Sequence, residues 1–131
     1  MNCKVEKSKI KGKINCPSNK SYTHRGIFLA SLAGNNSKVE NVLLSADTKA
    51  TIEACKKFGA VIEVNDSDII VKKSIKIGIN VPKINTENSG TTMRIAIGIA
   101  SLFSEEIILT GDTSLQKRPM QPLLDALSSI G

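Results

Sequence analysis

Three short stretches place basic and hydroxyl side chains directly before apolar runs, and these side-chain types suit the binding of small anions. The first is PSNKSYTHR, residues 17–25, in which Lys20 and Arg25 flank three hydroxyl groups. Two cations at a helix start oppose the positive end of the helix dipole, which costs stability unless an anion lies there. Exposed backbone N–H groups, a hydroxyl and two cations together favour a phosphate or carboxylate site. The alternative is an ordinary capped helix whose charges are solvated.

The second stretch is NSGTTMR, residues 88–94, which repeats the arrangement around a glycine. Gly90 has no side chain, so an anion can approach the backbone closely there. Two threonine hydroxyls follow, and Arg94 stands one turn further along. The alternative for this stretch is a glycine turn before a buried helix.

The third stretch is GDTSLQKRPM, residues 111–120, which places Lys117 and Arg118 just before another expected helix. Of these two cations, Arg118 is interpreted as functional and Lys117 as a solvated charge. A guanidinium can hold a carboxylate or phosphate with two parallel hydrogen bonds. The alternative is a basic loop that faces solvent.

The other polar residues of interest are interpreted as structural. His24 is the only histidine and is assigned a surface or first-turn role, while Asp47 and Asp112 are assigned to helix caps. No group of His, Cys and carboxylate residues has the spacing of metal ligands, and no phosphate loop of the type G-x-x-x-x-G-K-[ST] occurs. We therefore expect no metal ion.

The composition of the 131 residues is that of a globular domain, with 40% hydrophobic and 23% charged residues. Lys and Arg number 18 against 12 Asp and Glu, and the resulting net charge of +6 suits anionic partners from phosphate esters to nucleic acid. Aromatic residues amount to only 3%, so the core must be aliphatic. The same scarcity weakens an interpretation as a single-strand nucleic-acid binder, which needs aromatic stacking platforms.

The three cysteines favour a cytoplasmic location. Cys3, Cys16 and Cys55 are odd in number and widely spaced, which is typical of reduced, structural thiols. No stretch approaches the ~18 apolar residues of a membrane span. The N-terminus also lacks the apolar centre of a signal peptide. We expect neither secretion nor a membrane partner.

Hydrophobic periodicity predicts two similar sets of elements. The first set comprises, in order, a polar strand pair at 4–15, a buried helix at 22–33, a strand at 37–44, a helix from Asp47 or Thr48 to Phe58, and a hairpin with strands at 60–64 and 68–73. The second set follows a linker that contains Pro82 and comprises a helix at 89–103, a strand at 105–111 and a helix at 118–131 that opens with Pro119.

The second helix of the first set has the clearest signals. Ile52, Cys55 and Phe58 lie along one face, lysines occupy the last turn, and Gly59 follows. A glycine after a basic last turn is a common helix end.

The two sets form an internal repeat. Arg25 and Arg94 are 69 residues apart, and the Asp-Thr pairs that begin at Asp47 and Asp112 are 65 apart. A period of about 70 residues exceeds that of solenoid repeats and indicates a small α/β unit used more than once. Two candidate anion sites at matching repeat positions make coincidence less plausible. The second set lacks its closing strands, so we expect a fragment of a longer protein.

In this order, the three stretches resemble those of the EPSP synthase family, the 3-phosphoshikimate 1-carboxyvinyltransferases. Matches to the family pattern P-G-S-K-S-x-S-N-R-A are Pro17, Lys20, Ser21 and Arg25, and departures are Asn19, Thr23, His24 and Gly26. The pattern N-A-G-T-x-x-R is represented by NSGTTMR. The pattern L-T-G-D-x-S-L-x-x-R-P-M-x-P-L-x-x-A-L is matched almost throughout by LTGDTSLQKRPMQPLLDAL. The resemblance covers essentially the whole chain.

The resemblance implies an α/β fold of repeated βαβαββ units, part of one half of a two-domain, inside-out α/β barrel. Residues 1–15 would form an N-terminal strand region that packs with the other half. Residues 16–131 would form the first two units of one half, with the second unit incomplete. The missing C-terminal part of the same enzyme would then be a partner of this chain.

The reaction implied is transfer of the carboxyvinyl group of phosphoenolpyruvate to the 5-hydroxyl of shikimate 3-phosphate, with release of phosphate, in the shikimate pathway of chorismate and aromatic amino acid biosynthesis. The resemblance implies no cofactor. The implied substrate contacts are Lys20 with both substrates, Ser21 and Arg25 with shikimate 3-phosphate, the Gly90 N–H and Arg118 with phosphoenolpyruvate, and Asn88, Thr91 and Arg94 as support. No convincing acid–base pair is visible, so no catalytic residue is assigned within this chain. We expect it not to turn over substrate alone.

Two other functions stay open at this point. UDP-N-acetylglucosamine carboxyvinyltransferase is a sister enzyme that shares the fold and the phosphoenolpyruvate step. It is expected to carry Lys-Asn where this chain has Lys20 and Ser21. A basic nucleic-acid-binding module would suit the net charge, and its affinity would fall steeply with salt whichever small anion competes.

Overall fold

The computed structural model describes residues 3–34, 36–81 and 83–131. Pro82, which the predicted linker contains, lies outside the described residues. The elements follow in the order α1 (Lys20–Leu32), β1 (Ser37–Val39), α2 (Ala46–Lys57), β2 (Val61–Asn65), β3 (Asp68–Lys73), β4 (Lys83–Asn85), α3 (Gly90–Ala100), β5 (Ile108–Thr110), the 3-10 helix η1 (Leu115–Lys117) and α4 (Gln121–Ser128).

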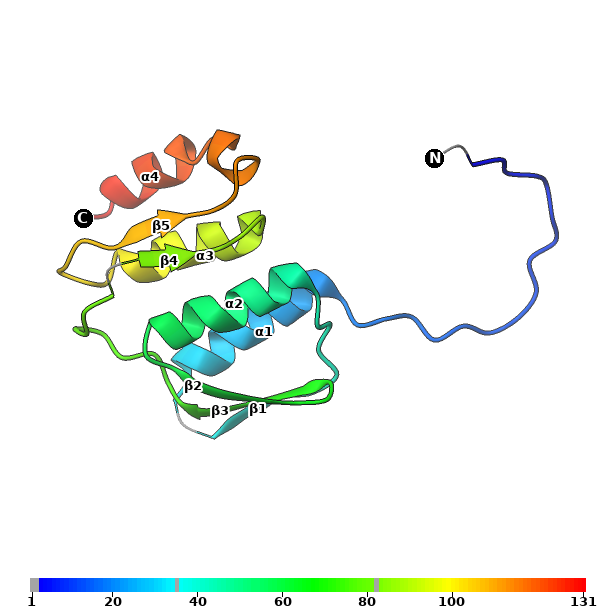
Figure 1. Cartoon of the computed structure of the whole chain (residues 1–131), viewed down its shortest axis with the longest axis horizontal. Coiled ribbons are helices and arrows are strands. Elements are labelled where there is room, and N and C mark those ends of the chain that lie inside the picture. Colours follow the sequence, from blue (N-terminus) through cyan, green and yellow to red (C-terminus); the bar gives the residue numbers. More distant parts are fainter. Residues whose placement is uncertain (1–2, 35, 82) are drawn as a thin grey trace.

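A layer of three helices joins two small sheets (Figure 1). The antiparallel sheet has the order β1-β3-β2 and packs on α1, whereas β4 and β5 pair in parallel next to α3. Because α3 also packs on α1 and α2, the starts of these helices are held in one body. α4 lies on the side of β5 that faces away from the three-stranded sheet. Helices pack against two sheets of short strands, so the chain has the α/β fold predicted.

The hairpin predicted from the Asn- and Asp-rich turn is confirmed. β2 and β3 pair antiparallel from Val61 with Lys73 to Asn65 with Asp68. Asp66 in the turn has φ of 50°, a left-handed conformation that Asn and Asp tolerate better than most residues. This hairpin lays an apolar face, which includes the fully buried Ile69, against α1.

The core is aliphatic, as the composition predicts. Ile27 of α1, Cys55 of α2 and Ile69 of β3 are fully buried in one continuous cluster. Phe58 and Phe103 supply its aromatic contact, with ring centroids 5.5 Å apart. Since each buried aliphatic side chain contributes about 1.5–3 kcal/mol, this cluster is what fixes the helices relative to one another.

The predicted face and end of the second helix are also confirmed. Ile52, Cys55 and Phe58 are buried together. Gly59 has φ of 95°, a conformation that most side chains avoid, and it follows the C-cap Phe58 directly. The first residue of this helix is nevertheless Ala46, because Ser45 is the N-cap and accepts a hydrogen bond from the Thr48 N–H. The prediction of Asp47 or Thr48 as the cap is therefore wrong.

The predicted strand pair at 4–15 is wrong. The described residues of this segment belong to no helix or strand, and Ile10 and Ile14 are 98% and 86% exposed. Figure 1 shows the segment leading away from α1 as an extended chain. A strand needs a neighbouring strand for its backbone N–H and C=O groups, and nothing in the described residues lies beside it.

The first helix begins two residues earlier in the sequence than predicted, and it is less buried. α1 begins at Lys20, because the Asn19 side chain accepts a hydrogen bond from the Tyr22 N–H at 3.0 Å and caps it. Tyr22 and Leu29 are 72% and 66% exposed, so only one face of α1 enters the core.

Other boundaries are also corrected. The strand predicted at 37–44 is limited to β1, and the helix at 89–103 ends with α3 at Ala100. β4 was predicted as part of a linker, since three residues are too few to show alternation. α4 begins at Gln121, so the proline in its first turn is Pro122 and not Pro119.

No helix in the described part of the chain combines the length and the apolar character that crossing a membrane requires.

Burial predicts a difference in reactivity among the three thiols. Cys55 is fully buried, and burial raises its pKa to about 12, whereas Cys3 and Cys16 are exposed. Because the thiolate is the nucleophile, iodoacetamide at pH 8 should alkylate Cys3 and Cys16 and leave Cys55 intact, as read by peptide mass spectrometry. In denaturing urea all three should react. Labelling of Cys55 as fast as Cys3 without urea would contradict this packing.

Candidate anion-binding site

The first basic cluster lies at the start of α1. Lys20 is the first residue of the helix, and its Nζ donates a hydrogen bond to Asp47 Oδ2 at 2.7 Å. Asp47 belongs to the first turn of α2, so this ion pair joins two helix starts. Exposed ion pairs contribute about 0–1 kcal/mol to stability. Asp47 is thus the counter-ion of Lys20 and not the helix cap predicted from the sequence.

Arg25 lies one turn along the same helix and is held by local contacts. Its Nε donates a hydrogen bond to the Ser21 backbone oxygen at 3.1 Å, and its Cζ lies 5.0 Å from the centroid of the Tyr22 ring. A cation over an aromatic face is stabilised by about 0.5–1 kcal/mol at exposed sites. Arg25 and Ser21 are both exposed, so their functional groups remain accessible to a ligand.

The second cluster joins two stretches that are far apart in the sequence. Arg118 Nη2 donates to Asn88 Oδ1 at 2.7 Å, and Asn88 Nδ2 donates to Asp112 Oδ2 at 2.7 Å. Asp112 Oδ1 in turn accepts a hydrogen bond from the Leu115 N–H at 2.7 Å. The structural role predicted for Asp112 is confirmed, although it braces a turn before η1 and not a helix.

Gly90 lies against the guanidinium of Arg118. A Cβ atom added at Gly90 would lie 2.9 Å from Arg118 Nη1. The backbone N–H groups at the start of α3 and the Arg118 cation are therefore neighbours, and both favour an anion. Asn88 belongs to the same cluster, because its Oδ1 accepts the hydrogen bond from Arg118.

The other two supporting residues are placed differently. Arg94 Nη2 donates to the Pro119 backbone oxygen at 3.2 Å and so secures the loop that carries Arg118. Thr91 is exposed on the first turn of α3, beside Gly90. Lys117 is exposed at the end of η1, in keeping with a solvated charge. Among the described residues, no cluster of His, Cys and carboxylates could hold a metal ion.

His24 is buried, which corrects the surface role assigned to it. It is 1% exposed, and its Nδ1 lies 2.6 Å from Thr51 Oγ1. Burial lowers the pKa of the imidazole; the nearby Asp47 opposes this effect, and Lys20 adds to it. The sequence offered no signal for this burial, because His24 lies between the polar first turn of α1 and its apolar part.

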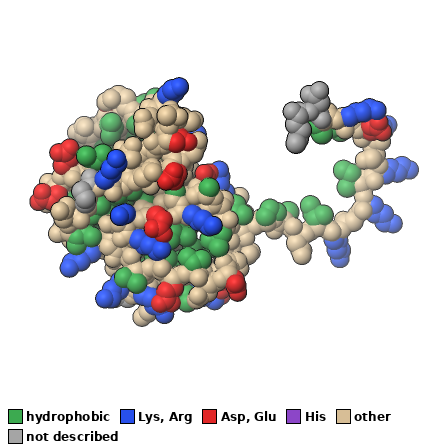
Figure 2. Space-filling model, in the orientation of Figure 1, with side chains coloured by type: hydrophobic (Ala, Val, Ile, Leu, Met, Phe, Trp, Pro, Cys, Tyr) green, Lys and Arg blue, Asp and Glu red, His purple; other side chains and the backbone are tan. Residues whose placement is uncertain are grey.

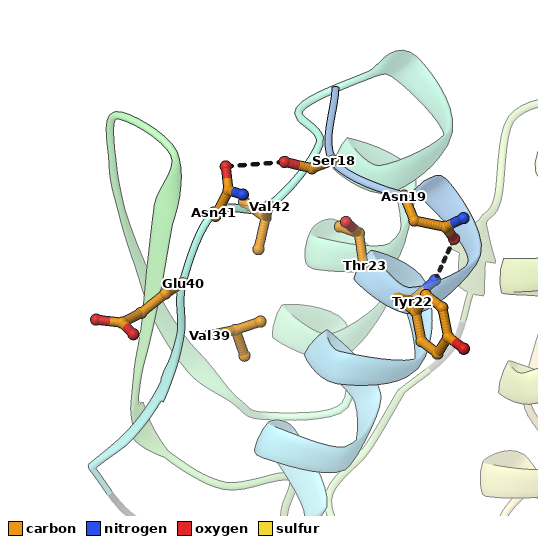
Figure 3. A pocket seen from close by; sticks show the side chains of 8 residues that line it. All are labelled: Ser18, Asn19, Tyr22, Thr23, Val39, Glu40, Asn41 and Val42. Carbon is orange, nitrogen blue, oxygen red and sulfur yellow. Dashed lines mark hydrogen bonds between the residues drawn. The ribbon is translucent and has the colours of Figure 1, made fainter. Parts of the chain in front are cut away.

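A hollow of about 280 Å³ opens beside the first cluster (Figure 3). Ser18, Asn19 and Tyr22 line it from the start of α1, opposite Glu40 and Asn41. Ser18 Oγ donates to Asn41 Oδ1 at 2.9 Å across its edge. Neither Lys20 nor Arg25 lines this hollow, so it is separate from the predicted anion site.

The close approach of Arg118 to Gly90 predicts a selective loss of binding in Gly90→Ala. The new methyl group displaces the end of a flexible side chain, so the free energy of unfolding should change by no more than about 1 kcal/mol. Affinity for a small anion, probed with inorganic phosphate, should fall, because the guanidinium and the backbone N–H can no longer face the same anion. Gly98→Ala in the same helix meets no atom within 4 Å and is the matched control. Equal affinities in the two variants, measured by calorimetry, would refute this geometry.

The buried imidazole predicts a pH-dependent stability. The pKa of folded His24 lies below its ordinary value of 6.5. The unfolded chain therefore takes up a proton below pH 6.5 that the folded chain does not. Stability should be unaffected by His24 above pH 6.5 and should fall below it, by at most about 1.4 kcal/mol per pH unit. Urea unfolding at pH 7.5, 6.5 and 5.5 should show this loss in the wild type and not in His24→Asn. Parallel pH profiles would contradict it.

Comparisons with known proteins show which family the chain belongs to. A profile of the family described as EPSP synthase (3-phosphoshikimate 1-carboxyvinyltransferase) matches residues 5–131. The 3-phosphoshikimate 1-carboxyvinyltransferase of Nitrosopumilus maritimus (strain SCM1) is 82% identical over all of this chain, which covers 31% of that protein. The enzyme of the same name from Methanococcus maripaludis (strain C7 / ATCC BAA-1331) is 49% identical over 94% of this chain and 29% of its own length.

Solved structures give the same result. EPSP synthase from Acinetobacter baumannii superimposes with a TM-score of 0.81 at 30% identity, over 92% of this chain and 28% of that one. The chain thus spans about 30% of the length of the relatives it matches. With a family profile over nearly its whole length and a relative at 82% identity, this chain belongs to the EPSP synthase family.

Proposed function

We propose that this chain supplies one side of the substrate site of a 3-phosphoshikimate 1-carboxyvinyltransferase. The whole enzyme transfers the carboxyvinyl group of phosphoenolpyruvate to the 5-hydroxyl of shikimate 3-phosphate and releases phosphate. The observation that supports this best is the cluster at the start of α3, where Arg118 lies against Gly90 and is held there by Asn88. Residues 30 positions apart meet there in an arrangement that suits a small anion.

The proposed contacts follow the chemistry of two anionic substrates that must approach each other. Fixed cations are needed to offset their mutual repulsion and to hold them in a reactive geometry. The proposed roles are Lys20 between both substrates, Ser21 and Arg25 on shikimate 3-phosphate, the Gly90 N–H and Arg118 on phosphoenolpyruvate, and Asn88, Thr91 and Arg94 as support. Asp47 adds a role not predicted from the sequence, since it holds the Lys20 ammonium at the start of α1.

The proton transfers of the reaction are assigned to residues outside this chain. Addition and elimination at the enol carbon need a proton donor and an acceptor. In the described residues, the carboxylates near the two clusters, Asp47 and Asp112, are already engaged with Lys20 and Asn88. The chain therefore binds substrates but needs the C-terminal remainder of the enzyme for turnover. Its unpaired cysteines suit the reducing cytoplasm.

The proposed function is favoured over the two alternatives. In Figure 2 basic and acidic side chains are interspersed on the visible face of the globular part, without the continuous basic stripe that nucleic acid favours. The aromatic content of 3% leaves few stacking platforms. Ser21 follows Lys20, where a UDP-N-acetylglucosamine carboxyvinyltransferase is expected to carry asparagine.

Calorimetric titration of this chain with shikimate 3-phosphate at low salt tests the proposal. Lys20→Ala removes a charge-assisted contact and should weaken binding about tenfold. Lys57→Ala, which removes a lysine at the far end of α2, is the matched control for net charge and should bind like the wild type. Indistinguishable titrations for the wild type and Lys20→Ala would refute the assignment. A loss of equal size in both variants would instead indicate a non-specific effect of charge.

A further inference from the structure

A chain of buried side-chain hydrogen bonds crosses the helical layer. Ser89 Oγ lies 2.6 Å from Thr92 Oγ1, Thr92 Oγ1 lies 2.7 Å from Thr51 Oγ1, and Thr51 Oγ1 lies 2.6 Å from His24 Nδ1. The four side chains are at most 2% exposed. They come from α3 with its N-cap, from α2 and from α1, so each of the three packed helices contributes to the chain. We name it the Ser89–His24 chain.

The two ends of this chain adjoin the two anion clusters. Ser89 immediately precedes Gly90 and is the N-cap of α3, where it accepts a hydrogen bond from the Thr92 N–H. His24 immediately precedes Arg25 and lies one turn after Lys20. The backbone oxygen of Asp47 lies 3.4 Å from Thr51 Oγ1 and is a second, more distant acceptor for the one proton of this hydroxyl.

Each hydroxyl in the chain can donate one proton to its neighbour. Burial lowers the pKa of His24 and so favours the neutral imidazole. In the tautomer that carries its proton on Nε2, Nδ1 accepts from Thr51. Thr51 then accepts from Thr92, and Thr92 accepts from Ser89, which satisfies all three contacts in one direction. Thr51 is the central member, because it is the link between α1 and α3.

Apolar side chains of the same shape would pack this layer without such a chain. A buried hydrogen bond adds only about 0.5–1.5 kcal/mol to stability, and replacing both partners by apolar groups can be neutral. What hydrogen bonds of 2.6–2.7 Å supply is geometry, because a small displacement breaks them, whereas an apolar contact tolerates sliding. The polar chain therefore defines where the start of α1 lies relative to the start of α3.

We propose that Thr51 is a positioning residue for the two-substrate site, acting through the Ser89–His24 chain. It sets the distance between the Lys20 end and the Gly90 end, so that the two anions are held side by side. The identity of these anions rests on the function proposed above, while the mechanical role of the chain does not. Thr51 touches neither substrate in this proposal.

The first test measures the mechanical role without ligand. Thr51→Val keeps the volume of the side chain and removes its hydroxyl. Residual dipolar couplings of the α1 and α3 amide groups at pH 7.5 should fit one rigid arrangement in the wild type and fail to do so in Thr51→Val. Thr51→Ser, which keeps the hydroxyl, should restore the wild-type couplings. Ser31→Ala removes a fully buried hydroxyl near the far end of α1 and is the matched control. A rigid arrangement unchanged in Thr51→Val would overturn the proposal.

The second test measures coupling between the two ends. The affinity for shikimate 3-phosphate is determined with and without saturating phosphoenolpyruvate. In Thr51→Val the gain caused by phosphoenolpyruvate should fall about fivefold, the equivalent of one hydrogen bond, while the affinity for each ligand alone stays within about twofold. Thr51→Ser should recover the coupling. Equal losses in the single affinities with unchanged coupling would show a merely structural residue and refute positioning.

Two further outcomes are distinguishable. If Thr51→Val does not fold, Thr92→Val breaks the same chain from α3 and takes its place. If both fold, the double variant should lose no more coupling than either single variant, because members of one chain are not additive. If the wild type binds neither ligand, the proposed function fails for this chain, and the dipolar couplings alone then decide whether Thr51 positions the helices.

Discussion

Positive charge gathered at helix starts is the constraint on which the rest of this structure depends. α1 and α3 each present the positive end of their dipole, which repels the cation that lies there: Lys20 is the first residue of α1, and Arg118 lies against Gly90 at the start of α3. The chain offsets this locally with carboxylates. Asp47 binds Lys20 directly at 2.7 Å, and Asp112 acts on Arg118 through Asn88. The cations are held in place but stay exposed to solvent. An incoming anion can therefore bind them without a rearrangement of the protein.

The internal repeat explains why this solution occurs twice. Asp47 and Asp112 are the matching residues of two Asp-Thr pairs, and each comes after a short strand, β1 or β5. Their tasks have diverged. Asp47 lies within the first turn of α2 and accepts a hydrogen bond from Lys20 directly. Asp112 lies before η1 and stabilises the turn there by accepting a hydrogen bond from the Leu115 N–H. The repeated unit thus preserved a carboxylate beside a basic cluster while the path from carboxylate to cation changed.

Membership in the EPSP synthase family offers a reason for cations that are fixed at the starts of two helices. Enzymes that join two anions need cations that are already oriented before the substrates arrive, because reorganising them during the reaction would raise the barrier. The layer of α1, α2 and α3 provides that rigidity through an aliphatic core and, at the helix starts, through buried hydroxyl groups. His24, a departure from the family pattern, is part of that buried polar layer and not of the exposed surface.

What the sequence alone determined was local. The three anion-binding stretches, the apolar face that contains Ile52, the hairpin turn at Asp66 and the helix end at Gly59 all depend on residues within one or two turns of each other. Such short-range preferences can be read from side-chain type and spacing, and so the fold class and the candidate site residues could be predicted. The same reasoning failed for residues 4–15, where a polar strand pair was predicted but no strand is present among the described residues.

Only the tertiary structure decided which distant residues meet. In the folded chain His24 is buried against Thr51, and Arg118 lies against Gly90. Asp47 is the counter-ion of Lys20 and not a helix cap, and the three-residue strands β4 and β5 pair with each other. Each of these contacts joins residues at least 20 positions apart, and the pairing energy of a single such contact is too small to leave a pattern in the sequence. Packing of the whole helical layer selects them together, because a contact between distant residues forms only when the core has already brought its two segments into place.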